Sequence, residues 1–228
     1  MLRCGRGIRQ VAADATSLEE AASRIVEYLY KELGNEQAIG RHTALIRFYM
    51  TRPFASLDSH LQTFATRVGG GVRPEPTTRC LTLVATAGSE SEWCDTSRSV
   101  GHQAIPLPSE NIVEQAPMIA QLIREMGLEI REVVYPDLNL IPERTGKTYN
   151  VFHVEDAVGS PYIPAQDGFV LKYGVRSVIG FGGLLPYGEF FAVIVFARGL
   201  IPPASAQRFK NIALDVKGII HPFARPTV

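Results

Sequence analysis

Two of the three cysteines, Cys80 and Cys94, are candidates for a redox pair, because two thiols can exchange with a disulfide. Cys94 precedes Asp95 in a polar segment, and a neighbouring carboxylate disfavours the reactive thiolate. Cys80 begins an apolar alternating segment, which favours burial as a packing residue. With Cys4 the count is odd, and neither a CxxC pair nor a Cys/His ligand series occurs. We therefore expect no disulfide scaffold, no metal site and a reducing compartment.

One histidine, His153, could sense a ligand or coordinate haem. His153 alternates with Phe152 and Val154 in an expected strand, so it faces away from these two apolar side chains. The alternative is a histidine of the core or surface. His102 and His153 do not form a recognisable metal spacing. The pattern identifies no cofactor.

A glycine-rich stretch, Gly180–Gly183, superficially suggests a phosphate loop. No Lys-Ser or Lys-Thr follows it, and a strand rather than a helix comes next, so the anion-binding geometry is missing. A bulge or a close backbone approach explains these glycines better. Arg176 could hold an anionic ligand or pair with an acid within the fold. Because no nucleophile–base arrangement is recognisable, we assign no catalytic residue and favour a non-catalytic role.

Helices are expected at both ends of the chain. An apolar stripe of helical spacing predicts a helix over Ser17–Leu33, with Ser17 and Glu20 as a capping box and Gly34 as a C-cap. A last helix is expected over Pro203–Ile220. In the middle, a helical pattern over Ser109–Met126 should break at Pro117. Shorter helices are expected at Leu57–Ala65 and Ala165–Tyr173.

Alternating apolar residues predict the strands. They are expected at Thr43–Met50, Cys80–Ala87, Glu129–Tyr135 and Tyr149–Val154. Val175–Leu185 and Phe190–Ala197 flank a short Pro/Gly connection, which is typical of an antiparallel hairpin. Strands joined by hairpins, rather than strict strand–helix alternation, favour an antiparallel α+β domain.

Composition limits the range of functions. The chain has 228 residues, 23 basic against 23 acidic, and 46% hydrophobic residues, which suits one globular domain. Neutrality offers no argument for nucleic acid or an anionic membrane. The longest apolar run, Phe190–Ala197, is far shorter than the ~20 residues of a membrane span. We expect a cytoplasmic protein with a flexible terminus at 1–16 and a folded core at 17–222.

The last third resembles the closing sheet of a GAF domain. Tyr173–Gly180 has the form of a "G-[VI]-R-S" strand start, followed by the hairpin and the last helix. Further stretches resemble GAF-like sensory modules at the front of bacterial histidine kinases and nucleotide cyclases: Ala104–Pro108, Glu114–Ile119, Ser160–Gln166 and Gly180–Gly183. The chain lacks the N-K-F-D-E residues of cyclic-nucleotide-binding GAF domains and the Cys-His pair that attaches bilin in phytochromes.

The resemblance implies one enlarged GAF-like domain over 1–228. Its α+β fold would have a central antiparallel sheet of about five to six strands, with terminal helices on one face and loops and short helices over the other. A ligand pocket would lie under this second layer, built from Gly88–Met126 and Tyr149–Tyr173. The pocket candidates are Trp93, His102, His153, Asp156, Tyr162, Phe169, Tyr173 and Arg176. Alternatively, the aromatic residues only fill the core.

Three functions follow from the resemblance. The first is a non-catalytic bacterial sensor that binds a small ligand or a partner. It would signal through its terminal helices, as a homodimer, to a kinase or cyclase output. The second is a thiol-dependent reductase similar to free methionine sulfoxide reductases, with Cys80 and Cys94 as redox residues. The third is an interaction protein with a filled pocket.

Overall fold

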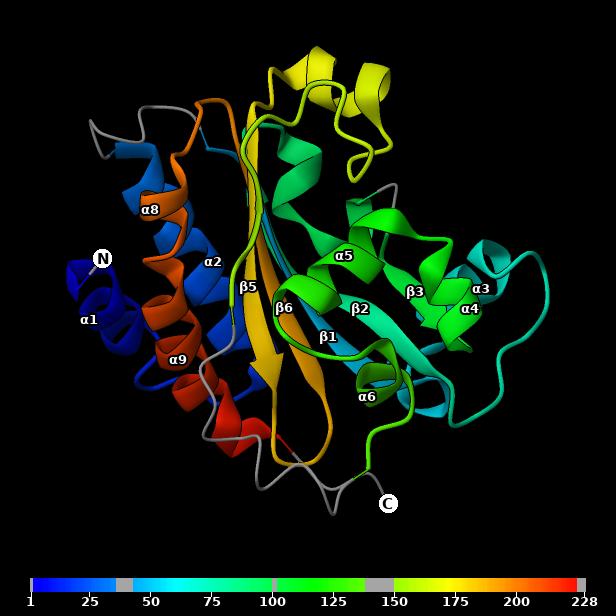
Figure 1. The fold of residues 1–228 in the computed structure, drawn as a ribbon. Helices are drawn as coiled ribbons and strands as arrows, with labels where there is room; N and C mark the ends of the chain where they lie inside the picture. The colour runs from blue at the N-terminus through cyan, green and yellow to red at the C-terminus, as the bar shows by residue number, and fades with distance from the viewer. Residues whose placement is uncertain (1, 36–42, 100–101, 138–149, 225–228) are drawn as a thin grey trace.

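A six-stranded antiparallel sheet forms the middle of the molecule (Figure 1). The computed structural model describes residues 2–35, 43–99, 102–137 and 150–224. The strand order is β3-β2-β1-β6-β5-β4. The strands are β1 (Thr43–Pro53), β2 (Arg79–Gly88), β3 (Ala104–Leu107), β4 (Phe152–Val154), β5 (Ser177–Leu184) and β6 (Phe190–Ala197). The expected hairpin is β5–β6, which pairs from Ser177 with Ala197 to Leu184 with Phe190.

The terminal helices cover one face of this sheet, which we call the helical face. They are α1 (Leu2–Val11), α2 (Leu18–Asn35), α8 (Pro203–Ala206) and α9 (Phe209–Ile220), all on one side of the strands in Figure 1. Ile25 and Leu29 of α2, Phe48 of β1, Phe181 of β5 and Phe209 of α9 are buried together there. The stripe that predicts the first long helix is therefore the surface that packs on the sheet.

Short helices and loops cover the other face, which we call the roof. They are η2 (Ser91–Cys94), η3 (Thr96–Arg98), α4 (Glu110–Glu114), α5 (Pro117–Glu125), α6 (Ile130–Val134) and the π-helical turn η4 (Gln166–Leu171). The remaining elements lie near the sheet edge or the C-terminus: η1 (Phe54–Ser56), α3 (Ser59–Val68) and η5 (His221–Phe223). The α+β class and the two-layered covering of the sheet are thus confirmed.

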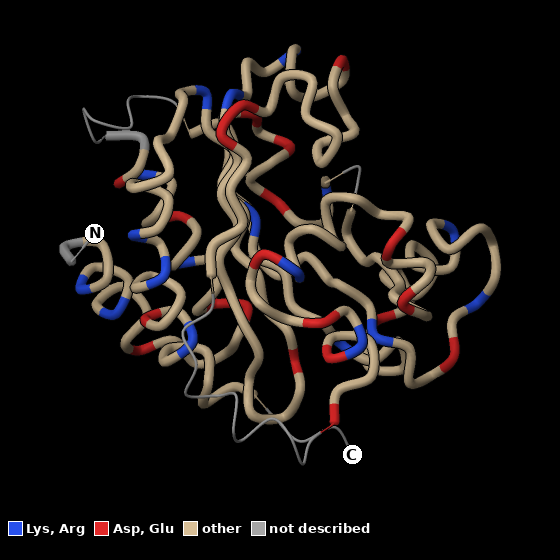
Figure 2. Tube along the Cα trace, in the orientation of Figure 1, with Lys and Arg blue, Asp and Glu red and all other residues tan. Residues whose placement is uncertain are grey.

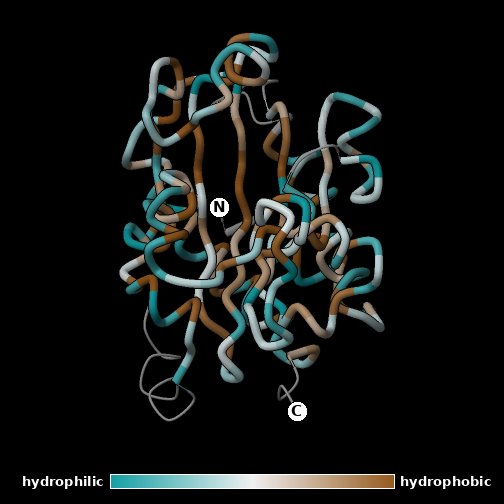
Figure 3. The backbone as a smooth tube through the Cα atoms, turned by 90° about the vertical axis from the view of Figure 1, so that its right-hand side faces the viewer, coloured by the Kyte–Doolittle hydropathy of each residue, from teal (hydrophilic) through white to brown (hydrophobic). Residues whose placement is uncertain are grey.

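Hydropathy and charge follow this layered arrangement. The central strands in Figure 3 are largely brown, whereas teal segments lie mainly in the outer loops and helices. Basic and acidic residues alternate along the chain in Figure 2 rather than gathering by sign. In the described part of the chain, no helix combines the length and the apolar character that a membrane span requires.

The start of α2 differs in detail from the expected capping box. The Glu20 N–H donates to Ser17 Oγ at 3.1 Å, as expected. The Glu20 carboxylate accepts a hydrogen bond of 2.8 Å from the N–H of Thr16 rather than of Ser17. At the other end α2 continues to Asn35, so Gly34 lies inside the helix and not at its C-cap.

Three expected elements are wrong or incomplete, and one strand was not expected. The N-terminal segment contains helix α1, with Cys4 and Ile8 buried one turn apart, instead of a flexible terminus. The strand expected at Glu129–Tyr135 is helix α6, because Ile130, Val133 and Val134 are buried at helical spacing behind a Glu129/Glu132 capping box. Strand β3 was missed because Pro106 interrupts its pattern, although proline is tolerated in an edge strand. β4 begins only at Phe152, and Tyr149 lies outside the described residues.

The break at Pro117 is confirmed. Helix α4 ends at Glu114, and Pro117 occupies the first turn of α5, where its missing N–H costs nothing. The last helix is also divided, since α8 ends at Ala206 and α9 begins at Phe209.

Two glycines of β5 allow close approach on both sides of the hairpin. A Cβ on Gly182 would overlap the backbone oxygen of Phe191 in β6. A Cβ on Gly180 would overlap the Leu122 side chain, by which α5 packs on the sheet. The glycines of this stretch therefore allow close packing. This agrees with the close backbone approach that we expected in place of a phosphate loop.

We predict that Gly182→Ala lowers the free energy of unfolding by about 1–3 kcal/mol, because the backbone of β6 must move. The matched control is Gly218→Ala in α9, where nothing lies within 4 Å of the new Cβ. This control should stabilise the protein by up to about 1 kcal/mol through helix propensity. Urea denaturation of both variants measures the difference, and equal stabilities would contradict the prediction.

Candidate functional site

Three of the predicted pocket residues form an aromatic cluster under the roof. Trp93 and Tyr173 have ring centroids 4.5 Å apart, and Phe169 lies 5.7 Å from Trp93. Phe169 also packs edge-on against Phe196 of β6, at 5.0 Å. Trp93 is 9% exposed, so these rings fill the space between η2, η4 and the sheet. This cluster acts as core packing and leaves Trp93 little contact with solvent.

Three other candidates lie at the surface. Arg176 Nη2 and Asp156 Oδ2 form an exposed ion pair at 3.0 Å. The hydrogen bond from Arg176 is the main cause that lowers the pKa of the Asp156 carboxyl. Tyr162 is exposed as well. For Arg176 the structure therefore supports pairing with an acid within the fold.

His153 lies on the opposite face from the aromatic cluster. Phe152 and Val154 belong to the roof core, whereas Ile179, the β5 residue paired with His153, belongs to the core of the helical face. Strand alternation therefore turns the His153 ring toward the helical face. Its backbone N–H donates to Glu125 Oε2 at 3.0 Å, and its buried Nε2 has no partner among the described residues. His153 thus cannot line the same pocket as Trp93.

A polar cluster in the middle of the roof face centres on Arg47. This residue belongs to β1 and pairs with Thr86 of β2 and Ile194 of β6. Its Nη2 donates to Ser99 Oγ at 2.9 Å, and its Nη1 donates to Tyr49 Oη at 3.3 Å. Its Nε is buried without a partner among the described residues. A charged side chain thus lies inside the roof layer with one donor left unused.

Gln103 and His102 complete this Arg47 cluster, which we define as Arg47, Tyr49, Ser99, His102 and Gln103. Gln103 Nε2 donates to the carbonyl oxygen of Ser99, while its buried Oε1 has no partner in the described chain. His102 has a left-handed backbone, with φ of 62°. Its side chain is exposed at one edge, yet desolvation by the surrounding chain and the charge of Arg47 both lower the pKa of its imidazole.

In this cluster Arg47 Nε is a donor without a partner, and Gln103 Oε1 is an acceptor without a partner among the described residues. Both atoms lie under the roof. A buried polar atom without a partner costs about 1–3 kcal/mol, so such atoms are uncommon outside functional positions. Of its members, sequence analysis named only His102. The sequence places Arg47 in a strand. Whether that strand is central, and its side chains therefore covered, depends on which strands pair with it.

The three cysteines differ in their exposure to solvent. Cys80 is buried beside Phe54 and Phe64, and burial raises the pKa of its thiol to about 12. Cys4 is also buried, whereas Cys94 is exposed with its Sγ 3.4 Å from the carbonyl oxygen of Gly88. Within the described residues no disulfide joins the three cysteines, and no group of three or more His, Cys, Asp or Glu residues gathers as a metal site.

We predict that iodoacetamide labels the native protein at Cys94 and leaves Cys80 and Cys4 unmodified, because only Cys94 is exposed. Mass spectrometry of native and urea-unfolded samples measures this difference, with all three cysteines labelled after unfolding. Cys94→Ser is the control and should remain unlabelled when native. Rapid labelling of native Cys80 would revive the reductase hypothesis.

No protein-family model and no curated protein matches the chain. Several solved structures do, each with 96% of this chain covered. The GAF domain of an Acinetobacter phosphoenolpyruvate-protein phosphotransferase has 15% identity, 91% coverage and a TM-score of 0.47. Free methionine-R-sulfoxide reductase from Neisseria meningitidis has 13% identity, 87% coverage and a TM-score of 0.49. The phycoerythrobilin-bound GAF domain of a cyanobacterial phytochrome has 13% identity, 94% coverage and a TM-score of 0.47. At these values the likeness concerns the fold alone, and nothing about a family, a ligand or an activity follows from it.

Proposed function

We propose that this protein is a non-catalytic regulatory domain that binds a small ligand at the Arg47 cluster. The observation that carries the proposal is the pair of buried, unused polar atoms, Arg47 Nε and Gln103 Oε1. A ligand with both an acceptor and a donor would satisfy them together and remove their desolvation cost.

The state of the thiols argues against the reductase alternative. A thiol with a pKa near 12 is almost entirely protonated at neutral pH, so Cys80 is a poor nucleophile. Cys94 alone would need a second thiol or another reductant to complete a catalytic cycle.

β1 provides a direct route from this site to the terminal helices. Arg47 faces the roof, while its neighbours Ile46 and Phe48 face the helical side and are buried with α2 and α9. A ligand that shifts β1 would therefore change how α2 and α9 pack. We propose that these helices pass the change to a separate kinase- or cyclase-type partner, and that they pair with a second copy. Leu214 of α9, which is 45% exposed, is available for such a contact.

Native mass spectrometry of the purified protein, followed by a thermal-shift screen of metabolites, tests the binding proposal. We expect either a retained small molecule or a metabolite that raises Tm. Arg47→Gln should weaken its binding about tenfold or more, because a charge-assisted hydrogen bond is lost. The same native spectrum reports whether the chain is a dimer.

Arg98→Gln is the matched control. Arg98 lies in the same roof segment, is exposed, and pairs with Asp95 at 3.7 Å, so its replacement removes the same charge without touching the cluster. It should leave ligand affinity unchanged. A ligand that binds wild type and Arg47→Gln equally, or a screen without any hit, would contradict the proposal.

A further inference from the structure

A buried arginine, Arg79, lies at the end of the sheet, whereas Arg47 is half-buried. Arg79 begins β2 and pairs with Pro53 of β1 and Leu107 of β3. It is only 8% exposed, and its Nη1 is buried without a hydrogen-bond partner among the described residues. A guanidinium stays charged at physiological pH. The free-energy cost of burying its unpartnered nitrogen is therefore not removed by loss of a proton.

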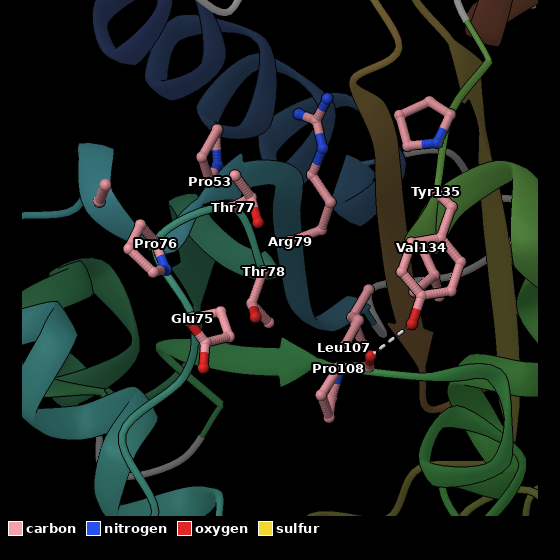
Figure 4. Close-up of a pocket in the computed structure, with 12 residues that line it drawn as sticks. Pro53, Glu75, Pro76, Thr77, Thr78, Arg79, Leu107, Pro108, Val134 and Tyr135 are labelled. Atoms are coloured by element: carbon pink, nitrogen blue, oxygen red, sulfur yellow. Dashed lines mark hydrogen bonds between the residues drawn. The ribbon is translucent and has the colours of Figure 1, made fainter.

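Arg79 lines a cavity of about 610 Å³, which we call the Arg79 groove (Figure 4). The groove lies between Pro53, the Thr77–Arg79 segment, the end of β3 at Leu107 and Pro108, and Val134–Pro136 after α6. In Figure 4 the Arg79 side chain extends between Pro53 on one side and Tyr135 on the other. The Tyr135 hydroxyl donates to the carbonyl oxygen of Pro108 at 2.8 Å, which holds this wall in place. The volume is within the usual range for small-ligand sites.

Glu189, whose charge acts on Arg79, forms no ion pair with it. Glu189, in the β5–β6 turn, is 7% exposed, and its Oε2 is also buried without a partner among the described residues. The two charges influence each other, but no ion pair joins them. Burial is the main influence on the Glu189 carboxyl and raises its pKa, which favours its neutral form. Among the described residues no ion pair holds Arg79, and its Nη1 remains without a hydrogen-bond partner.

We propose that the Arg79 groove binds a small monocarboxylate with an apolar body. A carboxylate matches the planar fork of a guanidinium, and the proline, leucine, valine and tyrosine walls suit an apolar body. Thr77 and Thr78 line the same groove, and in Figure 4 the Thr78 hydroxyl points away from the Arg79 guanidinium. The Glu75 carboxylate lines the groove and opposes a doubly charged anion, which favours a carboxylate over inorganic phosphate.

This site goes beyond the proposed function and does not depend on it. The Arg47 cluster and the Arg79 groove share no residue, and they lie at different positions along β1 and β2. Arg47→Gln should therefore leave the groove unaffected, so failure of one proposal does not imply failure of the other.

Titration with benzoate, followed by ¹H–¹⁵N NMR, tests the groove. We expect saturable shifts at the amides of Thr77, Thr78 and Arg79, weaker binding of inorganic phosphate, and no binding of the neutral analogue benzamide. Arg79→Gln should weaken benzoate binding about tenfold or more. Arg131→Gln is the control, because Arg131 is an exposed residue of α6 that pairs with Glu129 at 2.6 Å, and it should bind benzoate as wild type does.

Glu189→Gln keeps the proposal testable if Arg79→Gln does not fold. This variant retains Arg79 and removes the competing acid, so it should bind benzoate at least as tightly as wild type. Equal binding of benzoate and benzamide would overturn the proposal, as would tighter binding of phosphate. So would benzoate binding seen only in Glu189→Gln, because Glu189 would then already occupy Arg79 in the native protein.

Discussion

Burial of the central strands on both faces is the constraint on which the rest of the structure depends. β1, β5 and β6 lie between the terminal helices and the roof, so each successive side chain must pack into one layer or the other. This explains why Phe190–Ala197 is continuously apolar although its sheet is antiparallel. It also makes every polar side chain on these strands costly, since neither face offers free solvent.

The helical face and the roof cover the apolar sheet with different kinds of element. The helical face is built from long amphipathic helices, whose regular stripes supply large apolar side chains. The roof is built from short helices and turns, which bring backbone ends and polar side chains close to the sheet. Gly180 shows how closely they approach, since Leu122 of α5 occupies the space of its missing side chain. Polar sites therefore have more room to form under the roof.

Periodicity was enough to predict the helical face, the hairpin and the α+β class, because those elements are long and their patterns regular. It failed for α6, where Ile130, Val133 and Val134 fit a five-residue helix or a short strand equally well. The aromatic part of the predicted pocket came together under the roof, whereas His153 faces the other layer. Arg47 and Arg79 were missed as site residues because burial of a charge depends on which strands lie beside it, and pairing across the sheet cannot be obtained from local spacing.

The two arginines show why strand position matters more than residue type. Arg176 begins the same kind of apolar strand, yet it lies at the surface and pairs with Asp156, which satisfies it within the fold. Arg47 and Arg79 lie where neighbouring strands and roof elements exclude water, and each retains a buried nitrogen without a partner. An uncompensated buried cation is expensive, and an apolar residue at either position would be tolerated more easily by the core. Packing alone would have favoured neither arginine, and the two proposed binding sites would account for the cost of these unpartnered nitrogens.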